Sequence, residues 1–252
     1  MRALAIALIG ALLGTSGAFA QTHDECEVAA HLVPADYPLP RVATAIANKQ
    51  LNIVVVGTAS SLLAGPAGKQ EAYPSRLEAA LSRLLPGVTV KVTTHAKPRT
   101  TAEDMEKEIG HIVSTDKPAL VIWQTGTVDA IRRVDTETFR SSIEDGIEAI
   151  QAGNSDVILM NPQYSPRTES MIGVLPYAEA MRFVALQHEV PLFDRFAVMR
   201  QWVELGIFDL VEATKKIDTA EQVHQCVAEL LADLIVKAAQ LSHGTPPDVN
   251  KH

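Results

Sequence analysis

The chain alternates between short apolar runs and longer segments in which apolar residues recur every three or four positions. The first run, Leu51–Val56, is rich in β-branched residues and ends at Gly57. This pattern is typical of a strand that is buried on both faces. We expect further strands at four later runs, which are Val88–Thr93, Ala119–Gln124, Asp156–Met160 and Val190–Phe193.

Helical periodicity fills the intervals between these runs. Tyr73 opens a helix with Pro74 in its first turn, and Pro86 with Gly87 ends it. Other helices are expected at Val42–Ala47, Thr101–Val113, Thr138–Ala152, Tyr177–His188 and Thr219–Leu241. Strands that alternate with helices form right-handed crossovers and a parallel sheet covered on both faces. We therefore predict an α/β protein, a three-layer α/β/α sandwich with a five-stranded parallel sheet.

The first twenty residues have the features of a secretory signal peptide. Arg2 precedes the apolar run Ala3–Leu13, and the small-residue ending Ala18–Ala20 places the cleavage site before Gln21. The apolar run is too short to span a membrane, and we expect an exported protein, periplasmic or secreted. The remaining chain divides into an N-terminal arm with a short helix (21–50), one domain (51–243) and a flexible tail (244–252).

The net charge, the absence of certain motifs and the two cysteines limit the possible partners and cofactors of the protein. A formal net charge of −8 disfavours nucleic acid as a partner, because binding to phosphates needs a basic face. Neither a His-Glu-x-x-His or Cys-x-x-Cys spacing nor a phosphate-binding glycine motif is present, so we expect no metal and no nucleotide cofactor. After export, Cys26 and Cys226 meet conditions in which disulfides persist, and we predict that they pair; the alternative is two buried free thiols.

Ligands of open parallel sheets bind at the carboxyl ends of the strands. The segments that follow the five predicted strands are Gly57–Ser61, His95–Thr100, Thr125–Asp129, Asn161–Ser170 and Asp194–Arg195. The fourth segment carries Tyr164 and Arg167 in a loop longer than a minimal turn. Such a loop either faces a substrate or merely connects two elements.

Two blocks of sequence carry a resemblance to a known family. Residues 54–61 read Val-Val-Val-Gly-Thr-Ala-Ser-Ser, and residues 73–77 read Tyr-Pro-Ser-Arg-Leu. Together they resemble the opening of the SGNH/GDSL hydrolases, in which a strand precedes Gly-Asp-Ser or Gly-Ser-Ser. The resemblance continues through Thr101–Met105, Gly126–Asp129 and His224. It implies a flavodoxin-like sheet and a serine nucleophile in the first turn.

The same resemblance implies a histidine base with an acid three residues before it. His224 follows Glu221 at that spacing, and Asp218 is the other candidate acid. In strict register the nucleophile position is occupied by Ala59; if the turn is longer, the nucleophile is Ser60 or Ser61, and we favour Ser60. Nucleophilic attack would then need the serine hydroxyl, the imidazole and the acid in one chain of hydrogen bonds.

The oxyanion-binding groups depart from the family pattern. The family uses a glycine where this chain has Arg99, and an asparagine where it has Val128. Backbone amides near Gly57, Thr58, Gly126 and Thr127 are the remaining candidates for substrate and oxyanion binding, and Asp129 is expected to order the loop from beneath. Arg99 either stabilises an anion with its guanidinium or forms a surface ion pair.

Two functions remain open from the sequence. The first, which we favour, is a serine ester hydrolase that acts on a small-molecule, glycan or lipid ester, with the cell envelope as one source of such esters. The second is a catalytically inactive relative that serves as a periplasmic ligand-binding or envelope-assembly module. Ala59, Arg99 and Val128 support the second function, whereas His224 and the two serines support the first.

Overall fold

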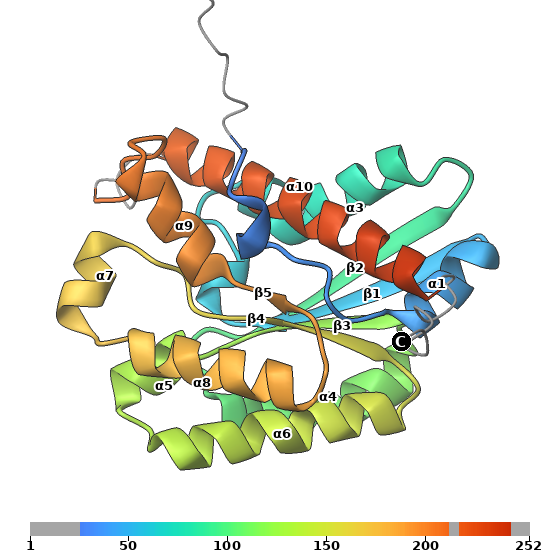
Figure 1. Ribbon diagram of the computed structural model, residues 1–252, viewed down its shortest axis with the longest axis horizontal. Helices are drawn as coiled ribbons and strands as arrows, with labels where there is room; N and C mark the ends of the chain where they lie inside the picture. Colours follow the sequence, from blue (N-terminus) through green and yellow to red (C-terminus); the bar gives the residue numbers. More distant parts are fainter. Residues whose placement is uncertain (1–25, 212–216, 243–252) are drawn as a thin grey trace, which may run out of the picture.

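The computed structural model describes residues 26–211 and 217–242. The predicted signal peptide (1–20) and tail (244–252) lie outside these residues. The strands are β1 (Gln50–Gly57), β2 (Thr89–Ala96), β3 (Leu120–Gln124), β4 (Asp156–Met160) and β5 (Leu192–Phe193). They form one parallel sheet in the order β2-β1-β3-β4-β5, which confirms the predicted five-stranded sheet (Figure 1).

Helices cover both faces of the sheet. The face formed by Leu51, Ile53 and Val55 packs against α1 (Pro40–Ala47), α3 (Tyr73–Leu84), α9 (Arg195–Glu204) and α10 (Ile217–Leu241). The other face packs against α4 (Ala102–Asp116), α6 (Thr136–Ala152) and α8 (Leu175–Gln187). Figure 1 shows the two helical layers above and below the strands, as expected for a three-layer sandwich. Shorter helices are η1 (Ala30–Leu32), η2 (Ala59–Ser61), α2 (Gly68–Glu71), α5 (Thr127–Arg132) and α7 (Pro166–Met171).

Several element boundaries differ from the prediction. β2 continues to Ala96, because its backbone stays paired with β1 as far as Gly57, although the apolar alternation stops earlier. The predicted loop Asn161–Ser170 contains the start of α7, where the Ser165 hydroxyl accepts a hydrogen bond from the amide of Thr168. The sequence pattern did not predict α9, whose buried stripe of Arg195, Val198, Met199 and Trp202 begins with a charged residue.

The disulfide between Cys26 and Cys226 confirms the predicted pairing and joins the N-terminal arm to α10. Further contacts hold the same arm. The amide of Ala29 donates to Gln201 Oε1 at 2.9 Å, and the amide of Leu39 donates to the carbonyl of Ala238 at 3.2 Å. Among the described residues, none of the helices combines the length and apolar character that crossing a bilayer requires.

Candidate active site

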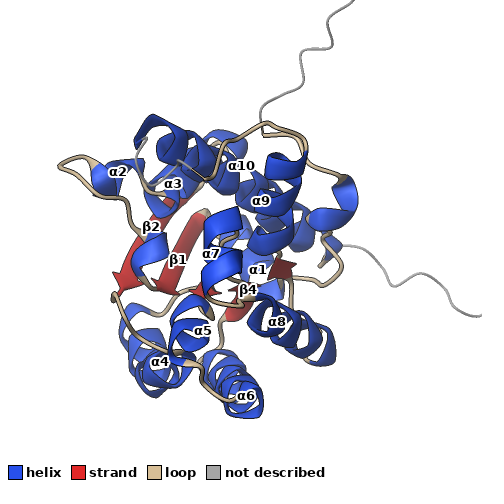
Figure 2. Cartoon of the chain, turned by 90° about the vertical axis from the view of Figure 1, so that its left-hand side faces the viewer, coloured by secondary structure: helices blue, strands red, loops and turns tan. Residues whose placement is uncertain are grey.

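A cavity of about 290 Å³ lies at the carboxyl edge of the sheet, where the loops after β1 and β4 meet α9 and α10. Figure 2 views the molecule from the side of α7, which lies in front of the strands there. The lining residues are Ala59, Ser60, Leu62, Leu63, Gln163, Tyr164, Ser165, Thr168, Arg195, Met199, Leu210, Ala220, Val223 and His224. The cavity therefore combines an apolar wall with a few hydroxyl groups, one imidazole and one guanidinium.

The turn after β1 determines where the two candidate serines lie. Ser61 is fully buried, and its Oγ lies 3.0 Å from Tyr73 Oη and 3.1 Å from Gln124 Oε1. A Cβ at Gly57 would lie 2.3 Å from this Oγ, so the turn requires glycine there. Ser60 instead lines the cavity, and its Oγ lies 3.4 Å from the hydroxyl of Thr58. Of the two serines, only Ser60 therefore faces the space in which a ligand could bind.

His224 lines the same cavity but is held by the backbone of another helix. Its Nδ1 accepts a hydrogen bond from the amide N–H of Tyr73 at 2.9 Å. A neutral imidazole that accepts at Nδ1 carries its proton on Nε2. Burial, assisted by the charges of Arg195 and Arg76, lowers the pKa of His224 from 6.5 to about 3, so the ring is neutral at physiological pH.

This hydrogen bond also fixes the orientation of the imidazole. If the ring were turned over, a carbon atom would face the Tyr73 amide and leave a buried donor without its acceptor. Such a loss costs about 1–3 kcal/mol. His224 therefore presents an N–H group at Nε2, whereas a general base that accepts the serine proton there would need that nitrogen unprotonated.

The candidate acids do not orient His224. Glu221 lies one turn earlier on α10 and is half-buried, and Asp218 is exposed. Within the described part of the chain, neither carboxylate forms a hydrogen bond or ion pair with the imidazole. The structure thus brings Ser60 and His224 to one cavity, while Ser61 and Glu221 are not part of a hydrogen-bonded triad with His224.

The predicted oxyanion residues lie around the neighbouring strand ends. Arg99 is exposed and has a φ of 70°, a backbone conformation that favours glycine, and its carbonyl accepts a hydrogen bond from Arg132 at 2.7 Å. Its guanidinium is not among the groups that line the cavity. The position thus keeps a backbone conformation suited to the family's glycine but carries a long charged side chain.

The loop after β3 contains the other predicted residues. Gly126, at a φ of 98°, lies against Pro162, and a Cβ there would be 2.8 Å from the proline ring. Thr127 follows it as the first residue of α5. The buried carboxylate of Asp129, on α5, accepts a hydrogen bond from the amide of Ala102 at 2.9 Å, which ties α5 to the start of α4. Burial raises the pKa of Asp129.

The two residues predicted in the loop after β4 have different surroundings. Tyr164 lines the cavity and contacts Phe196 edge-on, with ring centroids 5.1 Å apart. Arg167 lies on α7, is exposed and is not a lining residue.

Sequence reasoning gave no site role to Gln124 or Tyr73, and it placed Arg195 only in a segment that follows the fifth strand. Gln124 ends the buried strand β3, and its Oε1 accepts hydrogen bonds from the Thr58 amide at 3.2 Å and from Ser61. A polar residue at the end of an apolar strand was the available signal for it. Arg195 lies on the cavity wall and donates from Nη1 to the carbonyl of Ser60 at 3.0 Å.

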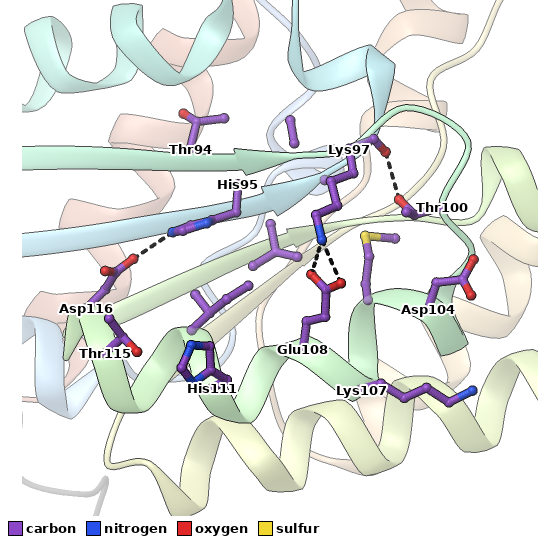
Figure 3. Close-up of a pocket in the computed structure, with 15 residues that line it drawn as sticks. Thr94, His95, Lys97, Thr100, Asp104, Lys107, Glu108, His111, Thr115 and Asp116 are labelled. Atoms are coloured by element: carbon purple, nitrogen blue, oxygen red, sulfur yellow. Dashed lines mark hydrogen bonds and ion pairs between the residues drawn. The ribbon is translucent and has the colours of Figure 1, made fainter.

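A second cavity, of about 520 Å³, lies between β2 and α4. Figure 3 shows two pairs of its side chains that point toward one another: His95 Nε2 lies 2.6 Å from Asp116, and Lys97 Nζ lies 2.5 Å from Glu108. The ammonium of Lys97 is therefore neutralised within the protein. No group of three or more histidine, cysteine or acidic side chains that could hold a metal ion occurs within residues 26–211 and 217–242.

The parallel sheet and the position of the 290 Å³ cavity at its carboxyl edge place the protein in the class of SGNH-like hydrolase folds. This class agrees with the resemblance seen in the sequence. The chain matches the model of the Non-GDSL lipase-like family over residues 25–241 and belongs to that family. No curated protein matches the chain.

Solved structures of esterases and lipolytic proteins share the fold. A lipolytic protein of the G-D-S-L family from Desulfitobacterium hafniense DCB-2 is 17% identical, with a TM-score of 0.57 and coverage of 73% of this chain and 98% of that one. An acetylxylan esterase from Geobacillus stearothermophilus is 16% identical, with a TM-score of 0.60 and coverage of 73% and 94%. A lipase/acylhydrolase from Enterococcus faecalis is 23% identical, with a TM-score of 0.53 and coverage of 77% and 96%.

Proposed function

We propose that this protein binds a small organic ligand in the 290 Å³ cavity without hydrolysing it by a serine–histidine mechanism. The observation that carries this proposal is the hydrogen bond from the Tyr73 amide to Nδ1 of His224. It supports a neutral imidazole with its proton on Nε2, which is a donor where ester hydrolysis needs a base.

The turn after β1 supports the same conclusion. In strict register Ala59 takes the family's nucleophile position and lines the cavity, whereas the hydroxyl of Ser61 holds the turn against Tyr73. The guanidinium of Arg99 is exposed outside the cavity, and Val128 lacks the amide side chain of the family's asparagine. Loss of one oxyanion donor alone typically lowers a rate by about 100- to 1000-fold. The fold is thus retained while several groups needed for the chemistry are changed.

The cellular setting is part of the proposal. A signal peptide in residues 1–20 would export the chain, and the disulfide is compatible with an oxidising compartment. We propose that the protein is a periplasmic or secreted binding module and that its ligands are small molecules derived from the cell envelope.

Ester hydrolysis is the second candidate, because Ser60 and His224 line one cavity in a fold shared with esterases. In this function Ser60 Oγ would attack the acyl carbon, and His224 would take the serine proton and pass it to the leaving alcohol. His224 would first have to break its hydrogen bond to the Tyr73 amide and move its own proton from Nε2.

The two functions are separated by labelling the exported, oxidised protein with a fluorophosphonate probe and by assaying short-chain p-nitrophenyl esters. The variants are Ser60→Ala, Ser61→Ala as a matched control outside the cavity, and His224→Asn, whose amide oxygen can still accept from the Tyr73 amide. We expect no labelling and no turnover above buffer in any form. Labelling of the natural protein that is lost in both Ser60→Ala and His224→Asn would establish the hydrolase and overturn the proposed function.

A further inference from the structure

Arg195 is a buried cation without an acidic partner in the described part of the chain. It is 1% exposed at the start of α9 and lines the 290 Å³ cavity. Nη1 donates to the carbonyl oxygen of Ser60, and Nε has no hydrogen-bond partner among the described residues. Burial lowers its pKa to about 10, so the guanidinium remains charged at neutral pH.

The neighbouring acid is already occupied. Asp194 accepts a hydrogen bond from Arg182 Nε at 2.5 Å and another from Asn161 Nδ2 at 2.7 Å. The guanidinium lies instead near the ring of Tyr73, whose centroid is 5.7 Å from Arg195 Cζ. A charge removed from water is costly unless an opposite charge accompanies it. The ammonium of Lys97 in the second cavity, in contrast, is paired with the carboxylate of Glu108.

We propose that Arg195 binds the carboxylate of a small aliphatic acid in this cavity, an inference that rests on the proposed binding function. A planar guanidinium matches a carboxylate in both charge and geometry. One buried cation balances one negative charge, and this favours a monocarboxylate over a doubly charged phosphate. The hydroxyl groups of Ser60 and Thr168 lie on the same cavity and can donate to an anion.

The rest of the cavity indicates the kind of chain to which the carboxylate is attached. Leu62, Met199, Leu210 and Val223 form an apolar wall, and this wall fits a short hydrocarbon chain better than a sugar. A volume of about 290 Å³ is at the lower end of ligand pockets and limits the acid to a small molecule. The ligand class is therefore a short- or medium-chain carboxylic acid.

Calorimetric titration of the oxidised protein at pH 7 with acetate, butyrate, hexanoate and octanoate tests this inference. Hexanamide, which has the same chain length as hexanoate without the charge, is the neutral comparison and requires no variant. We expect at least one acid to bind and the matched amide to bind at least 10-fold more weakly. Failure of all four acids to bind at millimolar concentration, or equal binding of hexanoate and hexanamide, would overturn the carboxylate site.

Two arginine variants on the same helix provide a matched pair. Arg195→Met should weaken hexanoate binding by at least 10-fold, whereas Arg200→Met, on the exposed side of α9, should change it by less than 2-fold. Because Arg195→Met removes an unpaired buried charge, its melting temperature without ligand should equal or exceed that of the natural protein. Undiminished binding by folded Arg195→Met would refute the assignment.

Failure of this inference is distinguishable from failure of the proposed function. Ala59 is exposed at the cavity, so Ala59→Phe should obstruct the cavity without disturbing the core. If this variant loses hexanoate and hexanamide equally while Arg195→Met keeps both, the cavity binds ligands but Arg195 does not select acids.

Discussion

Reduction of the disulfide between Cys26 and Cys226 should substantially lower the free energy of unfolding. The two cysteines are 200 residues apart, so the bond closes a loop that contains nearly the whole domain. In the chain-entropy description, a loop of this length lowers the entropy of the unfolded chain by roughly 18 cal/mol/K, or about 5 kcal/mol at 25 °C. The folded arm keeps other contacts, including the hydrogen bond from Ala29 to Gln201, so the main effect is on the unfolded state.

Urea unfolding of oxidised and reduced protein of the same sequence measures this effect. With a slope of about 3 kcal/mol per M, the midpoint should fall by roughly 1.5–2 M on reduction, and the slope should rise because the reduced unfolded chain exposes more surface. A Cys226→Ala variant is the control, and reductant should leave its midpoint unchanged. Midpoints corresponding to stabilities within about 1 kcal/mol of each other would refute the loop-entropy reasoning.

Two further predictions concern the core and the acid stability. Gly146→Ala should cost about 1–3 kcal/mol in urea unfolding, because a Cβ there lies 2.3 Å from the Trp123 ring, whereas Gly110→Ala on α4 meets nothing within 4 Å and should be neutral or stabilising. A similar loss of unfolding free energy in both variants would contradict the packing argument. In the folded protein the pKa of His224 is about 3, whereas in the unfolded chain this imidazole takes up its proton near pH 6.5. The free energy of unfolding should therefore fall as the pH drops from 6.5 toward 3, by up to about 1.4 kcal/mol per pH unit. His224→Asn, which retains an acceptor for Tyr73, should show a shallower acid transition by circular dichroism, and an unchanged slope would argue against this contribution.

Local patterns in the sequence determined most of the architecture. The apolar run Leu51–Val56 predicted a buried strand because strands inside parallel sheets are apolar on both faces. A helix was predicted to begin at Thr101, and in the structure Thr101 caps α4 through a capping box with Asp104. These signals depend on neighbouring residues alone. The disulfide between the two cysteines, by contrast, could be predicted only from the expected export of the chain.

Tertiary structure decided the chemistry of the cavity. The sequence favoured Ser60 over Ser61 without a physical reason, because the groups that hold Ser61 in the core, Tyr73 and Gln124, come from distant elements. It also suggested that His224 pairs with an acid on its own helix, whereas its Nδ1 accepts from an amide 151 residues earlier. Arg195 reads as an ordinary residue after a short strand until its burial is known. Protonation, orientation and unpaired charge depend on contacts between remote segments, and periodicity along the chain carries no information about those contacts.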